Sequence, residues 1–296
     1  MKKIVAQAVA FCLLLTLGAC SPKAEPQPLK VCSFNIRVSM HDGVDGSNSW
    51  FYRRHGAARF ISEQDFDIVG MQEVTKRQAG FLMDTLGTIY DSYGIDRESG
   101  LPEGQSESMT ILWKKERFEL LDKGSFWLSE TPDTVSLGWD ACCKRLVSWV
   151  KLSDALNPSL PVYFFNTHFD HIGPVARYQS SLLTLDKMRE ILNVKSLDKV
   201  KGVVFLTADF NSCITDEALK PLVETLGDAR ADSPETDSHS TWHDYGVAGG
   251  APIDHIFYLN ANPLKFAVDT SGYGVPYISD HYPVFFECTY PAVDAK

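Results

Sequence analysis

The sequence predicts a single α/β domain in which two β-sheets pack face to face and helices cover their outer sides. Short apolar runs recur between residues 30 and 288, and several are continuous, as expected for strands covered on both faces. Helical patterns lie between these runs, so strands and helices are interspersed in one unit. No internal repeat and no second Pro- or Gly-rich linker interrupts residues 30–290, which favours one domain over two.

The first residues are typical of a secretory leader. Residues 1–19 contain two lysines and an apolar run too short to span a bilayer as a mature helix, and they end in Leu17-Gly18-Ala19 before Cys20. This ending resembles a bacterial lipobox, in which cleavage leaves Cys20 as a lipidated first residue. An ordinary signal peptide that happens to contain a cysteine is the alternative. We expect a membrane-anchored protein of the bacterial cell envelope, outside the cytoplasm, with residues 20–29 as a Pro-rich tether.

The charge of the chain bears on its partners. The 296 residues have a formal charge of −10, which becomes −12 when the two leader lysines are lost. A long polyanion that is bound by direct ion pairing usually meets a basic face, and no dense Lys/Arg run follows the leader. Nucleic acid is therefore a disfavoured partner, although a bound divalent cation can supply positive charge locally.

Seven cysteines are present, of which Cys12 leaves with the leader and Cys20 would carry lipid. The remaining five form an odd, unclustered set, which does not predict a disulfide framework. No two of them have the two-residue spacing of a zinc site, so none is predicted. The adjacent Cys142 and Cys143 are expected to be unpaired or packed.

The individual elements follow from local patterns. Thr75-Lys76-Arg77-Gln78 has the form of a capping box, and Gly87 lies where that helix could stop. Pro174 suits the first turn of a long helix. Positions 175, 178, 182, 185, 189 and 192 of this helix, apolar except for Arg189, predict one core-facing stripe. Residues 46–60 are expected to form a loop. The predicted strands are 30–36, 67–71, 109–113, 146–152, 161–165, 202–207, 253–259 and 282–288.

Polar side chains stand at the ends of six predicted strands. A single Asn or Asp in such a place ordinarily caps a turn or satisfies backbone groups. Six strands that end in this way predict a shared site, because ionisable groups at buried strand ends must be paired or metal-bound to escape the cost of desolvation. The residues are Asn35, Glu73, His168, Asp209, Asn211, Asp254, His255, Asp280 and His281.

The ordered segments "SFN", "QE", "NTH", "DFN", "IDHI" and "SDHYPV" resemble the endonuclease/exonuclease/phosphatase superfamily, near its nocturnin and deadenylase-like branch. The resemblance extends from Val31 to Phe286. Single tripeptides are weak signals, but six in order at consistent spacing are strong. The resemblance implies a DNase I-like, four-layer sandwich and a hydrolase that acts on phosphate ester bonds.

The resemblance also implies a metal site. Glu73 would be the principal ligand, Asn35 would add a neutral oxygen, and Asp280 would offer a second carboxylate. Ligation by oxygen alone suits Mg²⁺ or Mn²⁺, with most coordination left to water and phosphate.

The catalytic roles that the resemblance implies fall on five residues. Asp209 would orient or deprotonate the attacking water, with help from Asn211. His281, paired with Asp254, and His168 would contact the phosphoryl oxygens and stabilise charge in the transition state. Whether His281 or Asp209 is the base stays open.

Several further residues are candidates for substrate contacts, and each has a structural alternative, such as a surface arginine or a packed aromatic. Asp170 and His171 follow His168 in "NTHFDH", and they could bind a second metal, hold the loop or read the substrate. The candidates are Trp50, Arg53, Arg145, Asp170, His171, Arg177 and His243.

These observations favour a metal-dependent phosphoesterase that acts outside the cytoplasm on a small phosphate ester or phosphodiester. A nucleotide, a sugar or inositol phosphate, and a phospholipid headgroup are the substrate candidates. The alternative is an extracytoplasmic nuclease on DNA or RNA, which would normally need Lys/Arg contacts away from the metal. A catalytically inactive binding module ranks third, because it should have lost one of the central site residues, and none is lost. No obligate protein partner is evident.

Overall fold

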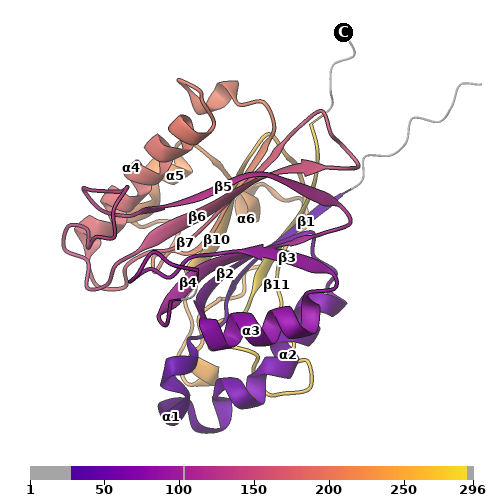
Figure 1. The fold of residues 1–296 in the computed structure, drawn as a ribbon, viewed down its shortest axis with the longest axis vertical. Helices are drawn as coiled ribbons and strands as arrows, with labels where there is room; N and C mark the ends of the chain where they lie inside the picture. The colour runs from indigo at the N-terminus through magenta and orange to yellow at the C-terminus, as the bar shows by residue number, and fades with distance from the viewer. Residues whose placement is uncertain (1–27, 103, 292–296) are drawn as a thin grey trace, which may run out of the picture.

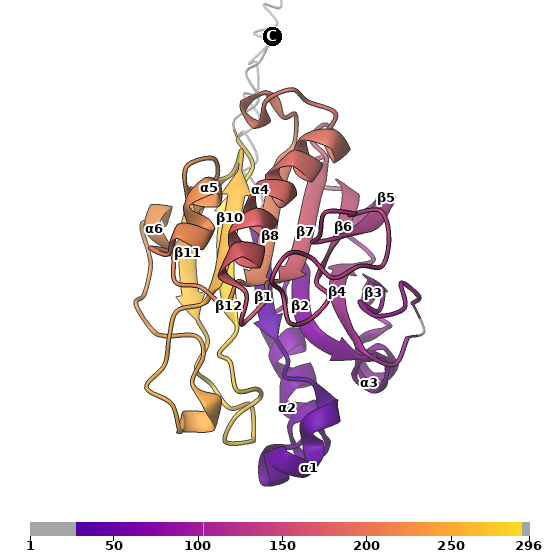
Figure 2. The same cartoon turned by 90° about the vertical axis from the view of Figure 1, so that its left-hand side faces the viewer.

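The computed structural model describes residues 28–102 and 104–291, which form two six-stranded mixed sheets that lie face to face (Figures 1 and 2). The leader and Cys20 lie outside the described residues. In order across the first sheet, the strands are β11 (Asn262–Val268), β12 (Val284–Thr289), β1 (Leu29–Asn35), β2 (Ile68–Thr75), β4 (Glu107–Lys114) and β3 (Tyr90–Tyr93).

The second sheet has β7 and β8 at its centre, and both strands are buried along their whole length. They pair in parallel, as β1 and β2 do in the first sheet, and the other strand pairs are antiparallel. In order, the strands are β5 (Phe118–Trp127), β6 (Leu146–Asp154), β7 (Val162–His168), β8 (Val203–Asp209), β10 (Asp254–Leu259) and β9 (Gly227–Asp228).

Helices cover the outer face of each sheet (Figure 1). α2 (Trp50–Glu63) and α3 (Lys76–Leu86) pack on the first sheet, and α4 (Pro174–Ile191) and α5 (Lys220–Val223) pack on the second. Among the described residues, no helix combines the length and the hydropathy that a bilayer crossing requires. The short elements are α1 (Asp42–Asp45), α6 (Ala229–Asp232) and five 3-10 turns, η1 (Ser39–His41), η2 (Gly46–Asn48), η3 (Leu197–Lys199), η4 (Glu217–Leu219) and η5 (Asp244–Gly246).

The buried apolar side chains form three main clusters that correspond to the interfaces of a four-layer sandwich. One cluster lies between the sheets and includes Val31, Ile68, Phe164 and Phe205. A second joins the second sheet to α4 and α5, and a third joins the first sheet to α2 and α3. The predicted fold class is therefore confirmed.

All eight predicted strands are present, and the Thr75 capping box, the end of α3 at Gly87 and the start of α4 at Pro174 are confirmed. The loop predicted over 46–60 is wrong, because η2 and α2 occupy it. Residues 53, 57, 60 and 61 of α2 recur at helical spacing and are buried against the first sheet.

The predicted core stripe of α4 is wrong in its first half. Val175, Tyr178 and Leu182 have exposed fractions of 51%, 38% and 36%, whereas Leu185 and Leu192 are buried. The helix instead buries a face made mainly of small side chains, which lets it lie close to η4 and α5. That face consists of Ala176, Ser180, Ser181, Thr184, Leu185 and Met188.

A layer of buried polar side chains joins the two sheets beneath their site end. Asn166 of β7 donates through Nδ2 to the carbonyl oxygens of Met71 and Thr110 in the first sheet, at 2.8 and 3.2 Å. Its Oδ1 accepts from Gln72 Nε2 at 2.7 Å and from Thr207 Oγ1 at 3.1 Å. Every polar atom of the Asn166 side chain is therefore satisfied, and three of its four hydrogen bonds cross the sandwich.

The backbone approaches this layer closely at Gly70. A Cβ atom added there would lie 2.2 Å from Thr207 Oγ1 and 2.7 Å from Asn166 Oδ1. Only glycine permits the two sheets to come together at this point.

We expect Asn166→Ala to lower the free energy of unfolding by about 3 kcal/mol, because it leaves buried carbonyl and amide groups without partners. Asn157→Ala provides the matched control, since within residues 28–102 and 104–291 the Asn157 side chain bonds only Ser159, in the β6–β7 loop. Its effect should stay below about 0.5 kcal/mol. Urea titration followed by circular dichroism measures both. Equal stability of the two variants would contradict a structural role for the polar layer.

Candidate active site

The polar ends of strands from both sheets surround one cleft of about 700 Å³. In the second sheet, the pairing of β7 with β8 sets His168 beside Asp209, and the pairing of β10 with β8 sets Asp254 beside Asp209. In the first sheet, the parallel pair β1 and β2 brings Asn35 next to the end of β2, where Glu73 lies. The polar residues that the sequence places at strand ends therefore lie together in the structure.

Glu73 reaches the cleft through a distortion of β2. The pairing of β2 with β4 shifts register around this residue, and its φ of 65° lies in the left-handed region that a residue with a side chain rarely adopts. Its carboxylate accepts hydrogen bonds from Asn35 Nδ2 at 3.1 Å and from the backbone N–H of Val38 at 2.7 Å. Burial alone would raise the pKa of Glu73, but these hydrogen bonds and nearby positive charges outweigh it, so the pKa is lowered. Glu73 is therefore an ionised, partly buried oxygen donor.

Asn35 links the two carboxylates that flank it. Its Nδ2 donates to Glu73 Oε1 and also to Asp209 Oδ2, the latter at 2.9 Å, and its Oδ1 accepts from the backbone N–H of Arg37 at 3.0 Å. The amide thus fixes the distance between a carboxylate of the first sheet and one of the second.

His168 lines the cleft and keeps one ring nitrogen free. Asn211 donates through Nδ2 to His168 Nε2 and to the carbonyl oxygen of Phe169, both at 3.0 Å. Because Nε2 accepts, the neutral ring carries its proton on Nδ1, and this buried atom has no hydrogen-bond partner within the described part of the chain. Burial, together with the charges of Arg145 and Arg97, holds the pKa of His168 well below its usual range. The ring is a neutral donor suited to a phosphate oxygen.

Asp254, His281 and Asp209 form a buried row. His281 donates through Nδ1 to Asp254 Oδ2 at 2.8 Å, and its Nε2 lies 3.6 Å from Asp209 Oδ2. Burial would lower the pKa of His281, but the charges of Asp254 and Asp209 outweigh it and raise the pKa well above its usual value. Burial and the charge of Asp254 raise the pKa of Asp209 to about 7. A cationic imidazole therefore lies beside a carboxylate whose protonation changes near neutral pH.

Asp280 and Arg37 form an ion pair in the cleft. Arg37 Nη1 lies 3.2 Å from Asp280 Oδ2, and Arg37 Nη2 lies 3.0 Å from Asp45 Oδ1. Burial and the charge of Glu73 raise the pKa of Asp280, while His281 and Arg37 act against them. Sequence reasoning did not identify Arg37, although it follows Asn35 by two positions.

Arg145 lines the cleft, and its Nε lies 3.8 Å from the carboxylate of Asp170. It is 4% exposed, and its Nη2 lies 3.2 Å from His171 Nδ1. Its Nε and Nη1 have no hydrogen-bond partner among the residues that the structure describes. A buried guanidinium with free N–H groups can bind a phosphate with directed hydrogen bonds.

Two further cleft residues carried no signal in the sequence. Arg97 donates through Nη1 to Glu107 Oε2 at 2.8 Å. Burial and the charge of Glu73 raise the pKa of Glu107 to about 7. Arg97 lies in the long β3–β4 connection and Glu107 begins an edge-proximal strand, so no strand-end motif pointed to them.

The carboxylates of the cleft fit a divalent cation. Four carboxylates line it together with three arginines and the cationic His281, and two of the carboxylates have pKa values raised to about 7. A bound divalent cation would stabilise the ionised forms of these carboxylates, and oxygen donors suit Mg²⁺ or Mn²⁺. The four are Glu73, Glu107, Asp209 and Asp280. Glu73, Asp280 and the Asn35 amide are the residues that could hold the ion.

Four predicted substrate contacts lie away from the cleft lining, and each has a packing role. Trp50 is buried against Phe81. Arg53 donates to the carbonyl oxygens of Ile36 and Ile278, at 2.8 and 2.9 Å. The other two behave similarly: Arg177 donates to the carbonyl oxygen of Asp170, and His243 stacks on Tyr282. His255 also has a structural partner, the carbonyl oxygen of Ser212.

The structure separates the roles of Asp170 and His171. Asp170 is 1% exposed, and its carboxylate accepts hydrogen bonds from the backbone N–H groups of residues 172 and 173 and of residues 142 and 143, at 2.7 to 3.2 Å. It therefore holds two loops together. His171 lines the cleft beside Arg145, where it can contact a substrate.

Comparison with solved structures finds the same fold in bacterial proteins. An endonuclease/exonuclease/phosphatase from Bacteroides vulgatus is 31% identical and has a TM-score of 0.81, with 89% of this chain and 99% of that chain covered. A mannosyl-6-phosphatase from Bacteroides thetaiotaomicron is 31% identical with a TM-score of 0.80, over 88% of this chain and 100% of that chain. The human nocturnin catalytic domain is 18% identical with a TM-score of 0.68, over 90% and 94% of the two chains, which shows a shared fold.

Comparison of sequences supports the same relationship as the comparison of structures. An uncharacterised protein of Acanthamoeba polyphaga mimivirus is 26% identical over 202 residues, which are 67% of this chain and 70% of that protein. The model of the Endonuclease/Exonuclease/phosphatase family matches residues 32–281. Members of this family are hydrolases that act on phosphate esters, and they generally depend on a divalent metal ion. The chain belongs to the endonuclease/exonuclease/phosphatase family.

Proposed function

We propose that the protein is a divalent-cation-dependent phosphoesterase that hydrolyses a small phosphate monoester, with sugar phosphates as the foremost class. The observation that carries the proposal is the set of unpartnered buried donors on Arg145 and His168, which line the same cleft as the Asp254–His281–Asp209 row. The volume of about 700 Å³ suits a small ligand. The likeness to a mannosyl-6-phosphatase, which extends over that whole chain, supports a sugar phosphate.

Each side chain of the site has a task in such a reaction. Arg145 and the Nδ1–H of His168 donate to the non-bridging phosphoryl oxygens, where negative charge collects in the transition state. Asp209, which bonds Asn35 and the backbone N–H of Asn211, accepts a proton from the attacking water. His281, held as a cation by Asp254, stabilises the charge that develops beside Asp209.

Glu73 and Asp280, with Asn35, would hold the divalent cation, which supplies Lewis acidity to the phosphoryl group when bound. The leader sequence supports a further part of the proposal, that the enzyme works outside the cytoplasm from a lipid anchor at Cys20.

The substrate class is tested by offering the full chain, with Mg²⁺ or Mn²⁺, hexose 6-phosphates, inositol phosphates, nucleotides, plasmid DNA and RNA. We expect phosphate release from one or more of the small esters and none after addition of EDTA. Cleavage of plasmid DNA or RNA without turnover of any small ester would overturn the proposal in favour of a nuclease.

Glu73→Gln should lower kcat/KM on the order of a hundred- to a thousandfold while the melting temperature changes little, because the carboxylate charge is lost and its shape is kept. Glu63→Gln is the matched control, since Glu63 lies on the exposed side of α2. Wild-type activity in purified Glu73→Gln would remove Glu73 from the metal site.

Arg145→Gln should lower kcat/KM about 10- to 100-fold, since hydrogen bonds to a charged group contribute about 1.5–3 kcal/mol. Arg77→Gln is the control, because the Arg77 side chain is 55% exposed and pairs with Asp42 outside the cleft. The measurement is kcat/KM of both variants, by steady-state kinetics, on the small phosphate ester that the wild-type protein hydrolyses fastest. An Arg145 variant with unchanged kcat/KM would exclude a phosphate contact.

The pH profile of kcat/KM should fall as the pH drops through about 7, because Asp209 must be ionised to accept a proton and its pKa is raised to about 7. The charge of Asp254 contributes to that raised value, so Asp254→Asn should move the acid limb to lower pH as well as reducing the rate. Asp186→Asn, at an exposed position of α4, should leave the profile in place. An acid limb that moves to higher pH in Asp254→Asn would contradict the assignment.

A further inference from the structure

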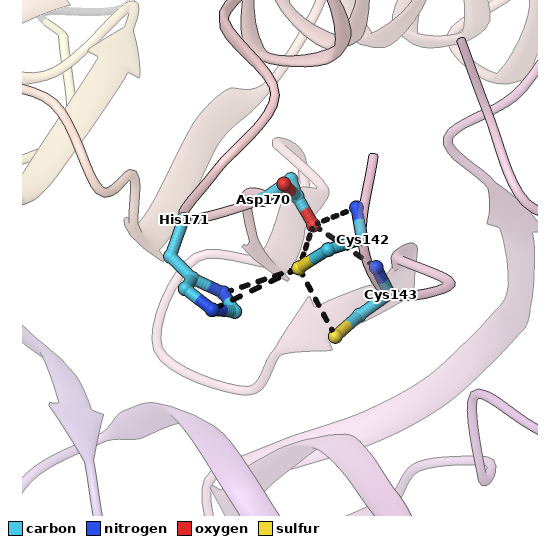
Figure 3. Close-up of side chains that lie close together, drawn as sticks. All are labelled: Cys142, Cys143, Asp170 and His171. Atoms are coloured by element: carbon cyan, nitrogen blue, oxygen red, sulfur yellow. Dashed lines mark hydrogen bonds between the residues drawn. The ribbon is translucent and has the colours of Figure 1, made fainter. Parts of the chain in front are cut away.

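A second group of metal-ligating side chains borders the cleft, and none of them belongs to the set around Glu73 described above. The loop before β6 supplies Cys142 and Cys143, and the loop after β7 supplies Asp170 and His171 (Figure 3). One ligand atom from each residue lies within 4.8 Å of all the others. We propose that Cys142, Cys143 and His171 bind a thiophilic divalent cation of the zinc class, with Asp170 positioning the two loops around it.

The distances within the cluster suit a tetrahedral ion. Zinc lies about 2.3 Å from sulfur and about 2.0–2.1 Å from nitrogen, so tetrahedral ligand atoms are about 3.5–3.8 Å apart. Cys142 Sγ lies 3.5 Å from Cys143 Sγ and 3.7 Å from each ring nitrogen of His171. Cys142 is therefore already at tetrahedral separations from the other two ligands, and Cys143 offers a ligand atom within 4.8 Å of that of His171.

The histidine lies between the thiols and Arg145. Arg145 donates through Nη2 to His171 Nδ1 at 3.2 Å, so the lone pair of Nδ1 is engaged and the neutral ring carries its proton on Nε2. An ion bound through Nδ1 would replace this hydrogen bond, and one bound through Nε2 would release the ring proton.

Asp170 suits a positioning role rather than that of a direct ligand. Both of its oxygens are engaged by backbone N–H groups of the two loops, as described above, and Oδ2 also lies 3.3 Å from Cys142 Sγ. These hydrogen bonds hold the Cys142–Cys143 segment against His171. Carboxylates that orient a ligand in this way are typical of protein metal sites.

The charges of the cluster balance once a cation is bound. Two thiolates, the Asp170 carboxylate and a divalent cation leave one net negative charge. Arg145, whose Nε lies 3.8 Å from Asp170 Oδ2, offsets that charge. Because the thiolate is the form that binds a metal, ion binding would release the protons of Cys142 and Cys143.

A three-ligand site leaves one coordination position for another oxygen. Cys143 and His171 both line the catalytic cleft, so this position is within reach of water or of a substrate hydroxyl there. The inference departs from the sequence-based expectation that the cysteines form no zinc site. It concerns metal binding alone and does not depend on the proposed phosphoesterase activity.

The test is a titration of the full chain, purified under reducing conditions and stripped by chelator, with Zn²⁺ in the presence of excess Mg²⁺. We expect one Zn²⁺ per chain, bound at least tenfold more weakly by Cys142→Ser, Cys143→Ser and His171→Gln. Titration with Cd²⁺ should produce the ultraviolet charge-transfer absorption of thiolate–cadmium bonds, and each cysteine variant should reduce it.

Two controls separate this site from the rest of the protein. Cys213→Ser removes another accessible cysteine beside a carboxylate, that of Asp216, and should keep the wild-type affinity and absorption. Glu73→Gln alters the catalytic centre and should also keep them. Zn²⁺ binding that survives the cysteine variants but is lost in Glu73→Gln would place the ion in the catalytic centre and overturn the inference. Absence of thiolate–cadmium absorption in the reduced wild-type protein would overturn it equally.

Discussion

The contact on which the rest of the structure depends is the polar layer around Asn166 between the two sheets. Catalytic groups come from both sheets: Glu73 and Asn35 from one, His168 and Asp209 from the other. Their relative positions are set by how the sheets dock. Apolar packing supplies most of the stability of such an interface, but it is tolerant of small displacements. Directed hydrogen bonds from Asn166 to the neighbouring sheet, and the close approach at Gly70, select one docking position and so fix the spacing of the site.

The electrostatics of the site follow from strand pairing together with that docking. The pairing of β8 with β10 brings Asp209 against Asp254 in a buried space and raises the pKa of Asp209, and the docking sets these two charges beside His281, which they keep cationic. Glu73 is linked to Asp209 through the side-chain amide of Asn35, and hydrogen bonds keep Glu73 ionised. Neighbouring carboxylates thus acquire different chemistry from their environments, one suited to metal ligation and one to proton transfer.

Strained backbone supports this arrangement at three places. Arg37, Glu73 and Asn211 have φ values of 61°, 65° and 49°. Residues other than glycine are held in this region only when the surroundings require it, and such residues cluster at functional sites. Each of the three directs a polar side chain into the cleft. Arg37 forms the ion pair with Asp280, Glu73 presents its carboxylate, and the amide of Asn211 sets the tautomer of His168.

The sequence predicted what depends on local pattern. Continuous apolar runs identified the central strands, and polar strand ends identified Glu73, His168, Asp209 and His281, because a strand's end position fixes where its side chain lies. Features that depend on tertiary partners were missed. β5 was overlooked because its exposed, polar pattern is not typical of a strand. The buried face of α4 was predicted wrongly because that face is made mainly of small residues, which carry no hydrophobic pattern. Arg97 and the Cys142–His171 cluster could not be found, since their partners come from separate loops.

The exposed character of β5 has a consequence for how the molecule meets others. This strand ends the second sheet, and a sheet edge offers unpaired backbone groups that can recruit another chain. Its pairing with β6 is interrupted by a bulge between Leu120 and Asp122, and Glu119, Asp122 and Lys123 are exposed along it. A bulged edge that presents both signs of charge is a poor template for a further strand. The residues that hid β5 from sequence reasoning are thus the ones that discourage edge-to-edge aggregation of the sandwich.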